Sequence, residues 1–172
     1  MTNFTIRAIN LNDLETLQSI SKQTFTETFA SSNTKENMDK YLEEALSLEN
    51  LTEELNNPNS FFYFIEDNHT PIGYLKLNMG ASQTELNDNT ALEIERIYVT
   101  QAYQGKKVGQ KLYEKAIQVA KEKGVEYIWL GVWEENHKAI QFYTKIGFIA
   151  FDKHIFNLGD ESQTDIMMKL PI

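Results

Sequence analysis

The sequence predicts an α+β fold built around one mixed β-sheet, and three observations support this prediction. Helical patterns fill most of residues 12–55, strand patterns dominate residues 61–99, and strands and helices alternate from residue 91 onward. A hairpin makes neighbouring strands antiparallel, whereas a helix that joins two neighbouring strands makes them parallel. A sheet that contains both kinds of connection is mixed.

The first third of the chain carries signals for one strand and three helices. Residues 4–9 alternate apolar and polar side chains, as a half-buried strand does. The capping-box pattern Asn-x-x-Glu occurs at 12–15 and again at 33–36, and each occurrence is expected to start a helix. A shorter helix is expected over 48–55 and should stop near Pro58, because proline cannot continue a helix.

The middle of the chain is expected to form a hairpin. Residues 61–65 and 71–79 are apolar strand runs, and the polar turn 67–70 separates them. Residues 80–89 are polar and contain no periodic apolar pattern, so we expect a loop there.

From residue 91 onward, strand and helix signals alternate. The run 92–99 is rich in β-branched and aromatic residues, as buried strands are. A helix should follow Gly105 and end at Gly124, because glycine readily adopts the left-handed conformation that ends helices. The remaining elements are expected as a strand at 126–133, a helix at 136–146 and strands at about 149–157 and 164–170.

Length and composition indicate a single domain that covers residues 1–172. Hydrophobic residues make up 41% of the chain, which is enough for one core. The absence of cysteine excludes disulfides and thiolate metal sites, and three scattered histidines show no metal-ligand spacing, so no metal is expected. The start MTNFTIRAIN lacks the pattern of a signal peptide, and no apolar run is long enough for a membrane span. We therefore expect a cytoplasmic protein without a membrane partner.

The net charge of −9 is distributed unevenly along the chain. Residues 1–90 contain 14 acidic and 5 basic residues, whereas residues 91–172 contain 11 of each. An acidic protein is a poor partner for nucleic acid, which requires a basic face. The acidic half suggests a cationic ligand, although acidic surface helices also serve solubility alone.

The segment 91–109 carries the clearest chemical signal. A buried strand ends in a turn that opens into a helix, and the free amides at the start of that helix favour an anion. Lys106, Lys107, Lys111 and Lys115 add positive charge, as expected for a site that binds a phosphorylated ligand. The segment lacks the Gly-Lys-Ser/Thr of a Walker A loop and the glycines of a dinucleotide-binding fold.

Two motifs in this half resemble those of the GCN5-related N-acetyltransferases (GNAT). The pattern Gln/Arg-x-x-Gly-x-Gly/Ala matches residues 104–109, except that Lys107 stands at the first glycine. The pattern Asn-x-x-Ala-x-x-x-Tyr-x-x-x-Gly-Phe matches residues 136–148 at every position. Each residue also has a purely structural explanation: Asn136 as a helix cap, Tyr143 as a packed aromatic and Gly147 as the end of a helix.

The resemblance implies the acyl-CoA N-acyltransferase fold, in which helices cover both faces of the sheet and the fourth and fifth strands splay apart. It also implies that acetyl-CoA is the cofactor and CoA the product. Its binding residues would be Ile97, Tyr98, Val99, Gln104, Gly105, Lys106, Lys107, Val108, Gly109, Gln110, Asn136, Ala139, Tyr143 and Lys145.

In this family an amine attacks the thioester directly in a ternary complex, and the resemblance implies the residues that move protons. Tyr143 corresponds to the general acid that protonates the CoA thiolate, and Glu95 to the general base. An ordinary glutamate is a poor acceptor for an ammonium proton, so Glu95 would need a raised pKa or a water relay. Glu93 lies on the same strand face and is the alternative base. Either glutamate could instead pair with Arg96 or bind the cationic substrate.

Similarity to one branch extends over most of the chain. The runs TFTETF, LEIERIYV, IWLGVWEEN and FNLGDESQTDIMM resemble the bacterial spermidine/spermine N-acetyltransferases of the PaiA type. A polyamine acceptor is therefore expected. The residues expected to line its entrance are Phe25, Glu27, Phe29, Glu36, Tyr41, Glu43, Glu44 and Glu93.

Two other functions remain open at this point. One is the same reaction on another amine, such as a protein N-terminus, an amino acid or an aminoglycoside, and the other is a non-catalytic CoA-binding regulatory module. The sequence is compatible with a homodimer but does not determine the oligomeric state.

Overall fold

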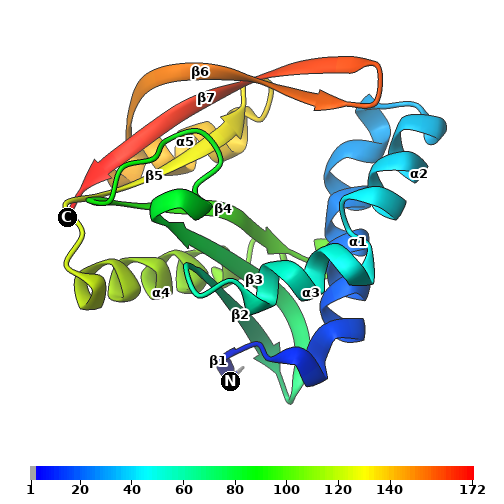
Figure 1. Cartoon of the computed structure of the whole chain (residues 1–172), viewed down its shortest axis with the longest axis horizontal. Helices are drawn as coiled ribbons and strands as arrows, with labels where there is room; N and C mark the ends of the chain where they lie inside the picture. Colours follow the sequence, from blue (N-terminus) through cyan, green and yellow to red (C-terminus); the bar gives the residue numbers. More distant parts are fainter. Residues whose placement is uncertain (1–2) are drawn as a thin grey trace.

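The computed structural model describes residues 3–172, which form a seven-stranded sheet with the strand order β1-β2-β3-β4-β5-β7-β6 (Figure 1). Strands β4 and β5 are parallel, and the other neighbouring strands are antiparallel. The prediction of a mixed α+β sheet is thus confirmed. The strands are β1 (Phe4–Ala8), β2 (Ser60–Asp67), β3 (Thr70–Met79), β4 (Ala91–Val99), β5 (Tyr127–Trp133), β6 (Ile149–Leu158) and β7 (Glu161–Pro171).

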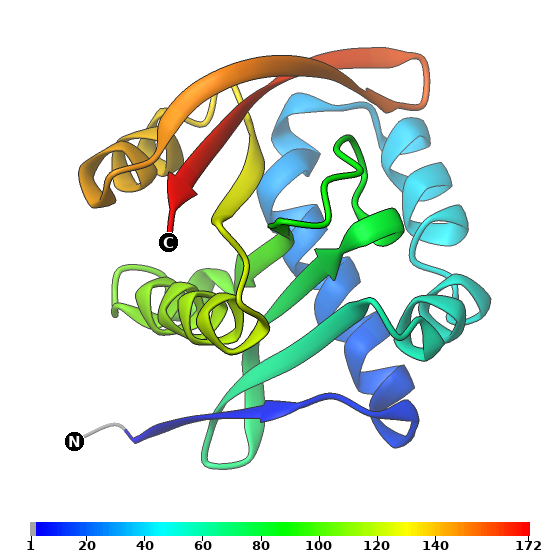
Figure 2. The same ribbon diagram turned by 60° about the vertical axis from the view of Figure 1, so that its left-hand side comes forward.

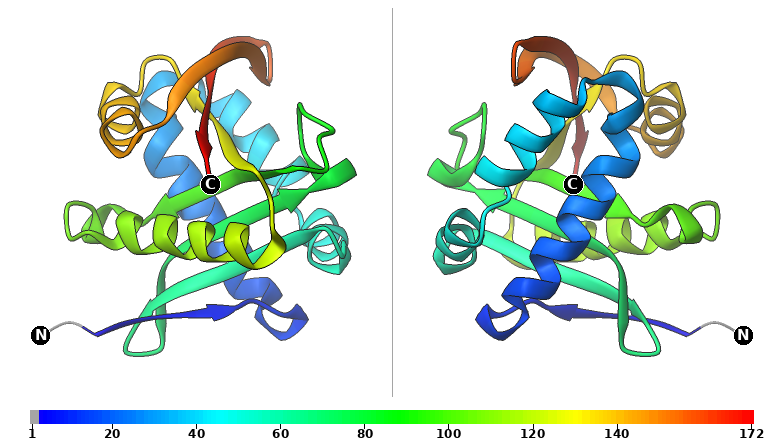
Figure 3. Two further views of the ribbon diagram at one scale, coloured as in Figure 1. Left: turned by 90° about the vertical axis from the view of Figure 1, so that its left-hand side faces the viewer. Right: turned by 90° about the vertical axis from the view of Figure 1, so that its right-hand side faces the viewer.

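Helices cover both faces of the sheet (Figure 3). One core cluster joins the sheet to α4 and α5, and a second cluster joins the other face to α1, α2 and α3. The helices are α1 (Leu14–Phe29), α2 (Lys35–Glu44), α3 (Leu48–Asn56), α4 (Val108–Lys123) and α5 (His137–Ile146).

Strands β4 and β5 separate part of the way along their length. They are paired from Ala91 with Tyr127 to Ile94 with Leu130, and the pairing ends there. Both strands continue beyond this point, so residues 95–99 and 131–133 face each other across a gap (Figure 2). The splayed fourth and fifth strands that the family resemblance implied are therefore present.

The helix starts in the first third differ slightly from the predicted ones. Asn10, rather than Asn12, accepts a hydrogen bond from a turn amide, and Asp13 accepts the Asn10 amide in return. This capping box starts a short 3₁₀ turn that leads into α1. The cap of α2 is Thr34 rather than Asn33. Both predictions were wrong by one or two residues because several neighbouring polar residues can accept the same amides.

A β-bulge interrupts β4 at the start of the gap. Lys76 of β3 lies opposite Arg96 and Leu77 lies opposite Ile94, so Glu95 is an extra residue without a partner of its own. A bulge places two consecutive side chains on the same face of a strand. Ile94 and Ile97 consequently both pack into the cluster beneath α4, while Glu95 and Arg96 both project toward α1–α3.

The tip of the hairpin formed by β6 and β7, at one edge of the sheet, contacts α2 (Figure 2). At its tip, the Asn37 side chain donates a hydrogen bond to Asp160 at 2.6 Å. Gly159 lies directly against Asn37, since a Cβ atom there would approach the Asn37 amide oxygen to 2.1 Å. This contact joins the last hairpin to the helices of the first third.

Candidate functional site

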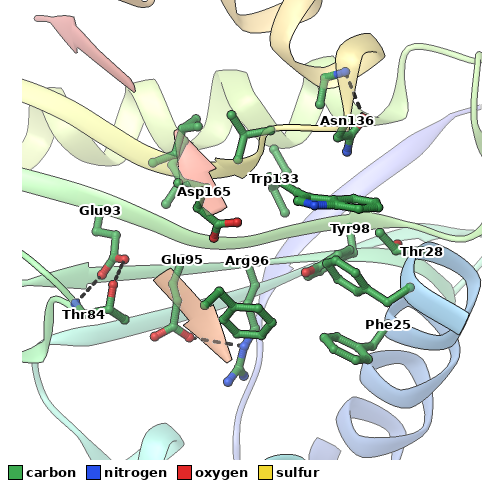
Figure 4. Close-up of a pocket in the computed structure, with 18 of the residues that line it drawn as sticks. Phe25, Thr28, Thr84, Glu93, Glu95, Arg96, Tyr98, Trp133, Asn136 and Asp165 are labelled. Atoms are coloured by element: carbon green, nitrogen blue, oxygen red, sulfur yellow. Dashed lines mark hydrogen bonds and ion pairs between the residues drawn. The ribbon is translucent and has the colours of Figure 1, made fainter. Parts of the chain in front are cut away.

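A cavity of about 530 Å³ occupies the gap between β4 and β5 and extends toward α1 and α2 (Figure 4). Its walls come from both strands of the gap, from α1, α2 and α5, and from the β6–β7 hairpin. The cavity is therefore assembled from segments that are distant in sequence. Its position at the unpaired ends of two strands gives a ligand access to free backbone groups, which would otherwise need water as partner.

Some of the expected cofactor-binding residues meet at this cavity. Ile97, Tyr98, Val99, Gln104, Asn136, Ala139 and Tyr143 all line it. Residues 105–110 form the turn before α4 and the first turn of that helix and do not line the cavity, so their contact with the cofactor stays a prediction. Lys145 is exposed on α5 and does not line the cavity.

The turn before α4 contains two residues with positive φ angles. Gly105 has a φ of 80°, and Lys107, at the start of α4, has a φ of 63° and no side-chain hydrogen bond that caps the helix. Lys107 occupies the position where the family motif has glycine, and its left-handed conformation explains that preference. The first amides of α4 remain available to an anion, together with the positive end of the helix dipole.

Asn136 has the capping role that its position suggested. Its Oδ1 accepts a hydrogen bond from the Ala139 amide at 3.2 Å and so fixes the start of α5 (Figure 4). The same side chain lines the cavity. Its amide NH₂ group is left to donate to a ligand, so the structural and binding roles are compatible.

Tyr143 is buried in α5 and lines the cavity. Its ring makes edge contacts with Phe142 and Phe148, at centroid distances of 5.4 and 5.5 Å. Burial raises the pKa of the phenol above its ordinary value, which keeps the hydroxyl protonated at neutral pH. The hydroxyl therefore has a proton to donate at the gap, but its raised pKa makes it a weaker acid than a free phenol, and its packing alone would also explain an aromatic residue here.

Glu93 is almost fully buried beneath the 80–89 loop. It accepts hydrogen bonds from the Asn78 side chain, the Thr84 amide and the Thr84 hydroxyl. Burial raises the pKa of Glu93, and these hydrogen bonds oppose that effect without cancelling it. The side chain is thus already occupied by protein donors.

Glu95 belongs to a buried network of four charges. Its carboxylate lies 2.8 Å from Lys76 Nζ and 3.2 Å from Arg96 Nε, and Arg96 also binds Glu54 through two hydrogen bonds of 3.0 Å. Burial tends to raise the pKa of Glu95, but Arg96 and Lys76 outweigh burial and lower it. The raised pKa that a general base would need is therefore not found at Glu95. Pairing with Arg96, the alternative left open by the sequence, is present.

The side of the cavity nearest the early helices is aromatic rather than acidic. Phe25 stacks on Tyr41 with a centroid distance of 4.1 Å, and Phe29 lies 6.1 Å from Trp133 and 6.4 Å from Phe156. All five rings line the cavity. Phe25, Phe29 and Tyr41 thus line the cavity, and their contact with a substrate stays a prediction.

The expected acidic residues of the first third do not reach the cavity. Glu27 accepts a hydrogen bond from the Gln101 amide and faces a different hollow. Glu36, Glu43 and Glu44 are exposed on α2 and do not line the cavity. Charge composition located the acidic half of the chain but could not show which helix faces its side chains occupy.

The carboxylates that do reach the cavity come from elsewhere. Besides Glu93 and Glu95 they are Glu85, from the 80–89 loop, and Asp165, from β7, beside His154 of β6. Sequence reasoning did not identify these three residues. For His154 and Asp165 the only signal was the alternation of polar residues within the closing strands, which does not show which polar residue faces the gap. For Glu85, in a polar loop, the sequence offered no signal.

Comparison with known proteins identifies the family. Residues 15–148 match the Acetyltransferase (GNAT) family. An uncharacterised N-acetyltransferase of Lactobacillus delbrueckii subsp. lactis is 40% identical over 98% of both chains. The spermidine N(1)-acetyltransferase of Thermoplasma acidophilum is 29% identical and covers 86% of this chain and 89% of its own.

A solved structure agrees with this assignment. The PaiA N-acetyltransferase of Thermoplasma acidophilum, in complex with coenzyme A, superposes with a TM-score of 0.82 at 26% identity and covers 99% of each chain. The chain belongs to the GNAT family and is an acetyl-CoA-dependent N-acetyltransferase.

The residues present fit acetyl-CoA as the acyl donor. Residues 97–99 have no pairing partner on β5, and the first amides of α4 have no side-chain cap. Within residues 3–172, no helix is long and apolar enough to cross a membrane. The same range contains no group of three His, Cys, Asp or Glu side chains placed to hold a metal ion.

Proposed function

We propose that this acetyltransferase acetylates a primary amine of a polyamine such as spermidine or spermine. The observation that carries the proposal is the division of the cavity into two parts. Carboxylates surround the end where β4 and β5 part, and aromatic rings line the end near α1 and α2. A chain with several ammonium groups and short alkyl spacers matches both parts, because carboxylates attract the charges and rings pack on methylene groups.

The relatives support this choice of acceptor. A spermidine N(1)-acetyltransferase sequence and a PaiA N-acetyltransferase structure, both from Thermoplasma acidophilum, are similar to this chain over most of its length. The glutamates of the early helices do not support a polyamine acceptor, because they lie outside the cavity. The acidic contribution comes instead from Glu85 and Asp165, since Glu93 is held by Asn78 and Thr84 and Glu95 by Lys76 and Arg96.

Catalysis in this proposal relies on holding both reactants in line at the gap. Acetyl-CoA supplies the activated acyl group. Tyr143 donates a proton to the departing thiolate, Asn136 orients the donor, and the backbone of residues 97–99 holds it against β4. Holding two reactants in a productive geometry accounts for a large part of the acceleration in such reactions.

A panel of amines tests the acceptor. Release of CoA thiol would be measured with spermidine, spermine, monoamines of equal length, an amino acid, an aminoglycoside and a peptide N-terminus. We expect kcat/KM to be highest for the polyamines and to fall as ionic strength rises, because salt screens the attraction between ammonium groups and cavity carboxylates. Acetyl-CoA affinity measured at each salt concentration is the control.

Equal kcat/KM for a polyamine and its matched monoamine, or no salt dependence, would reject the polyamine. The aromatic wall also favours a monoamine with an apolar body, and the same panel would reveal that preference.

A further inference from the structure

His154 and Asp165 form a pair at the point where the sheet opens. The two residues lie opposite each other in the β6–β7 ladder, and Asp165 also lies opposite Trp133 of β5. His154 Nε2 is 3.4 Å from Asp165 Oδ2, and both side chains are more than four-fifths buried. Figure 4 shows Asp165 pointing into the cavity.

Gly131 gives this pair its place beside the gap. It is the first residue of β5 after the last pair with β4. A Cβ atom on Gly131 would lie 3.0 Å from His154 Cε1 and 3.6 Å from Asp165 Oδ2. The missing side chain therefore leaves room for the imidazole and the carboxylate over this face of β5, beside the gap.

The other carboxylates on the β4 side are engaged by protein groups. Glu93 accepts three hydrogen bonds, and Glu95 is held by Lys76, Arg96 and Asn78. A proton acceptor needs a free lone pair that faces the substrate. Asp165 accepts no hydrogen bond from any residue in the described range 3–172 apart from the approach of His154, so it retains such a lone pair.

We propose that Asp165 is the catalytic residue that takes the proton from the acceptor ammonium, and that His154 is the positioning residue that holds the carboxylate. This inference concerns the acetyltransferase reaction itself and holds for any alkyl amine acceptor. It assigns to β6 and β7 the role that the family resemblance assigned to β4.

The ammonium gives one proton to Asp165, which passes it to water, and the neutral amine then forms the C–N bond with the acyl carbon. The C–S bond breaks, and the thiolate takes the Tyr143 proton. The second proton leaves the nitrogen and restores Tyr143, so one proton is released for each amide formed.

The charges around the pair agree with this role. Burial raises the pKa of Asp165, His154 lowers it and Glu85 raises it, and the net shift is upward. A carboxylate with a raised pKa is the better proton acceptor. The other titratable or charged groups that line the same cavity are Glu93, Glu95, Arg96, Tyr41, Tyr74, Tyr98 and Tyr143.

The test compares Asp165→Asn with the wild-type protein on two acceptors that differ in their need for a base. One is an alkyl amine, which is protonated at neutral pH, and the other is an aromatic amine or hydroxylamine, which is already neutral. For the alkyl amine we expect kcat/KM at neutral pH to fall by about 10²–10⁴-fold. The loss should shrink at alkaline pH and should be small for the neutral amine.

Three further variants complete the design. Glu95→Gln should not show this dependence on acceptor and pH, and Glu161→Gln, which removes an exposed charge from the same strand, should leave activity unchanged. His154→Gln should show a weaker form of the Asp165→Asn profile. Thermal unfolding and acetyl-CoA affinity verify that each variant is folded, and Asp165→Ser, which also removes the carboxylate, replaces the Asn variant if that one does not fold.

An equal loss for both acceptors at every pH would overturn the proposal, because it would indicate binding or packing. The proposal would also be overturned if Glu95→Gln, rather than Asp165→Asn, showed a loss of kcat/KM that depends on acceptor and pH. Wild-type activity on other amines but not on polyamines would reject only the acceptor proposed above.

Discussion

Arg96→Ala removes the central cation of the buried charge network beneath the gap. Arg96 binds Glu54 through both terminal nitrogens at 3.0 Å and lies 3.2 Å from Glu95. Removal of one partner of a buried pair costs about 3–5 kcal/mol. Lys76 remains 2.8 Å from Glu95 and 3.3 Å from Glu54, so we expect the lower end, about 3 kcal/mol. In a domain of this size that lowers Tm by about 6–12 °C.

The measurement is urea unfolding at neutral pH, supported by thermal unfolding. The pKa of Glu95 is lowered in the folded protein, so its contribution is fully present above the unfolded pKa and is lost as pH falls through the folded pKa. The penalty of Arg96→Ala should therefore shrink in acid. In a double-mutant cycle with Glu54→Ala, the two costs should add to clearly more than the cost of the double variant. A penalty under about 1 kcal/mol, or simple additivity, would refute the view that these charges act as one network.

Three further predictions concern the donor side. Gly109→Asp should abolish most acetyl-CoA binding measured by calorimetry, whereas Gly109→Asn should retain it. Only the aspartate sets a carboxylate against a phosphate. Both side chains have room, because a Cβ atom on Gly109 would lie 3.9 Å from Val99. Equal affinities in the two variants would remove this helix start from the site. Tyr143→Phe should lower turnover by about 10²–10⁴-fold with acetyl-CoA affinity and Tm nearly unchanged, and a loss below about threefold would favour the packing role. Lys107→Gly should leave the free energy of unfolding unchanged or raise it by up to about 1 kcal/mol. Glycine removes the strain of a lysine at positive φ, and this gain offsets the greater entropy of the unfolded chain. A clear destabilisation would contradict this.

The sequence predicted the elements well because their signals are local. The hairpin around 67–70, the left-handed end of α4 at Gly124 and the cap at Asn136 each depend on a few neighbouring residues. The donor motifs were readable for the same reason. The positive φ angle of Lys107 could not be predicted from the sequence, because lysine rarely adopts the left-handed conformation.

The acceptor side was harder to predict because it depends on contacts between distant segments. Glu95 meets Lys76 and Arg96 together only because a bulge places residues 95 and 96 on one face, and strand alternation alone cannot show this. Asp165 and His154 reach the cavity because of the β6–β7 register. Glu27 belongs to the correct helix, but it turns away to bind the amide of Gln101.

The contact between Asn37 and the tip of the last hairpin has a mechanical consequence. Strands β4 and β5 are joined by pairs at only four positions, so the separation of their free ends is not determined by those pairs alone. The hairpin forms one wall of the cavity and α2 contributes to another, and Asn37, Asp160 and Gly159 join the hairpin to α2. The width of the gap in which acyl group and amine meet thus depends partly on this contact, and a variant that weakens it is expected to let the hairpin move away from α2.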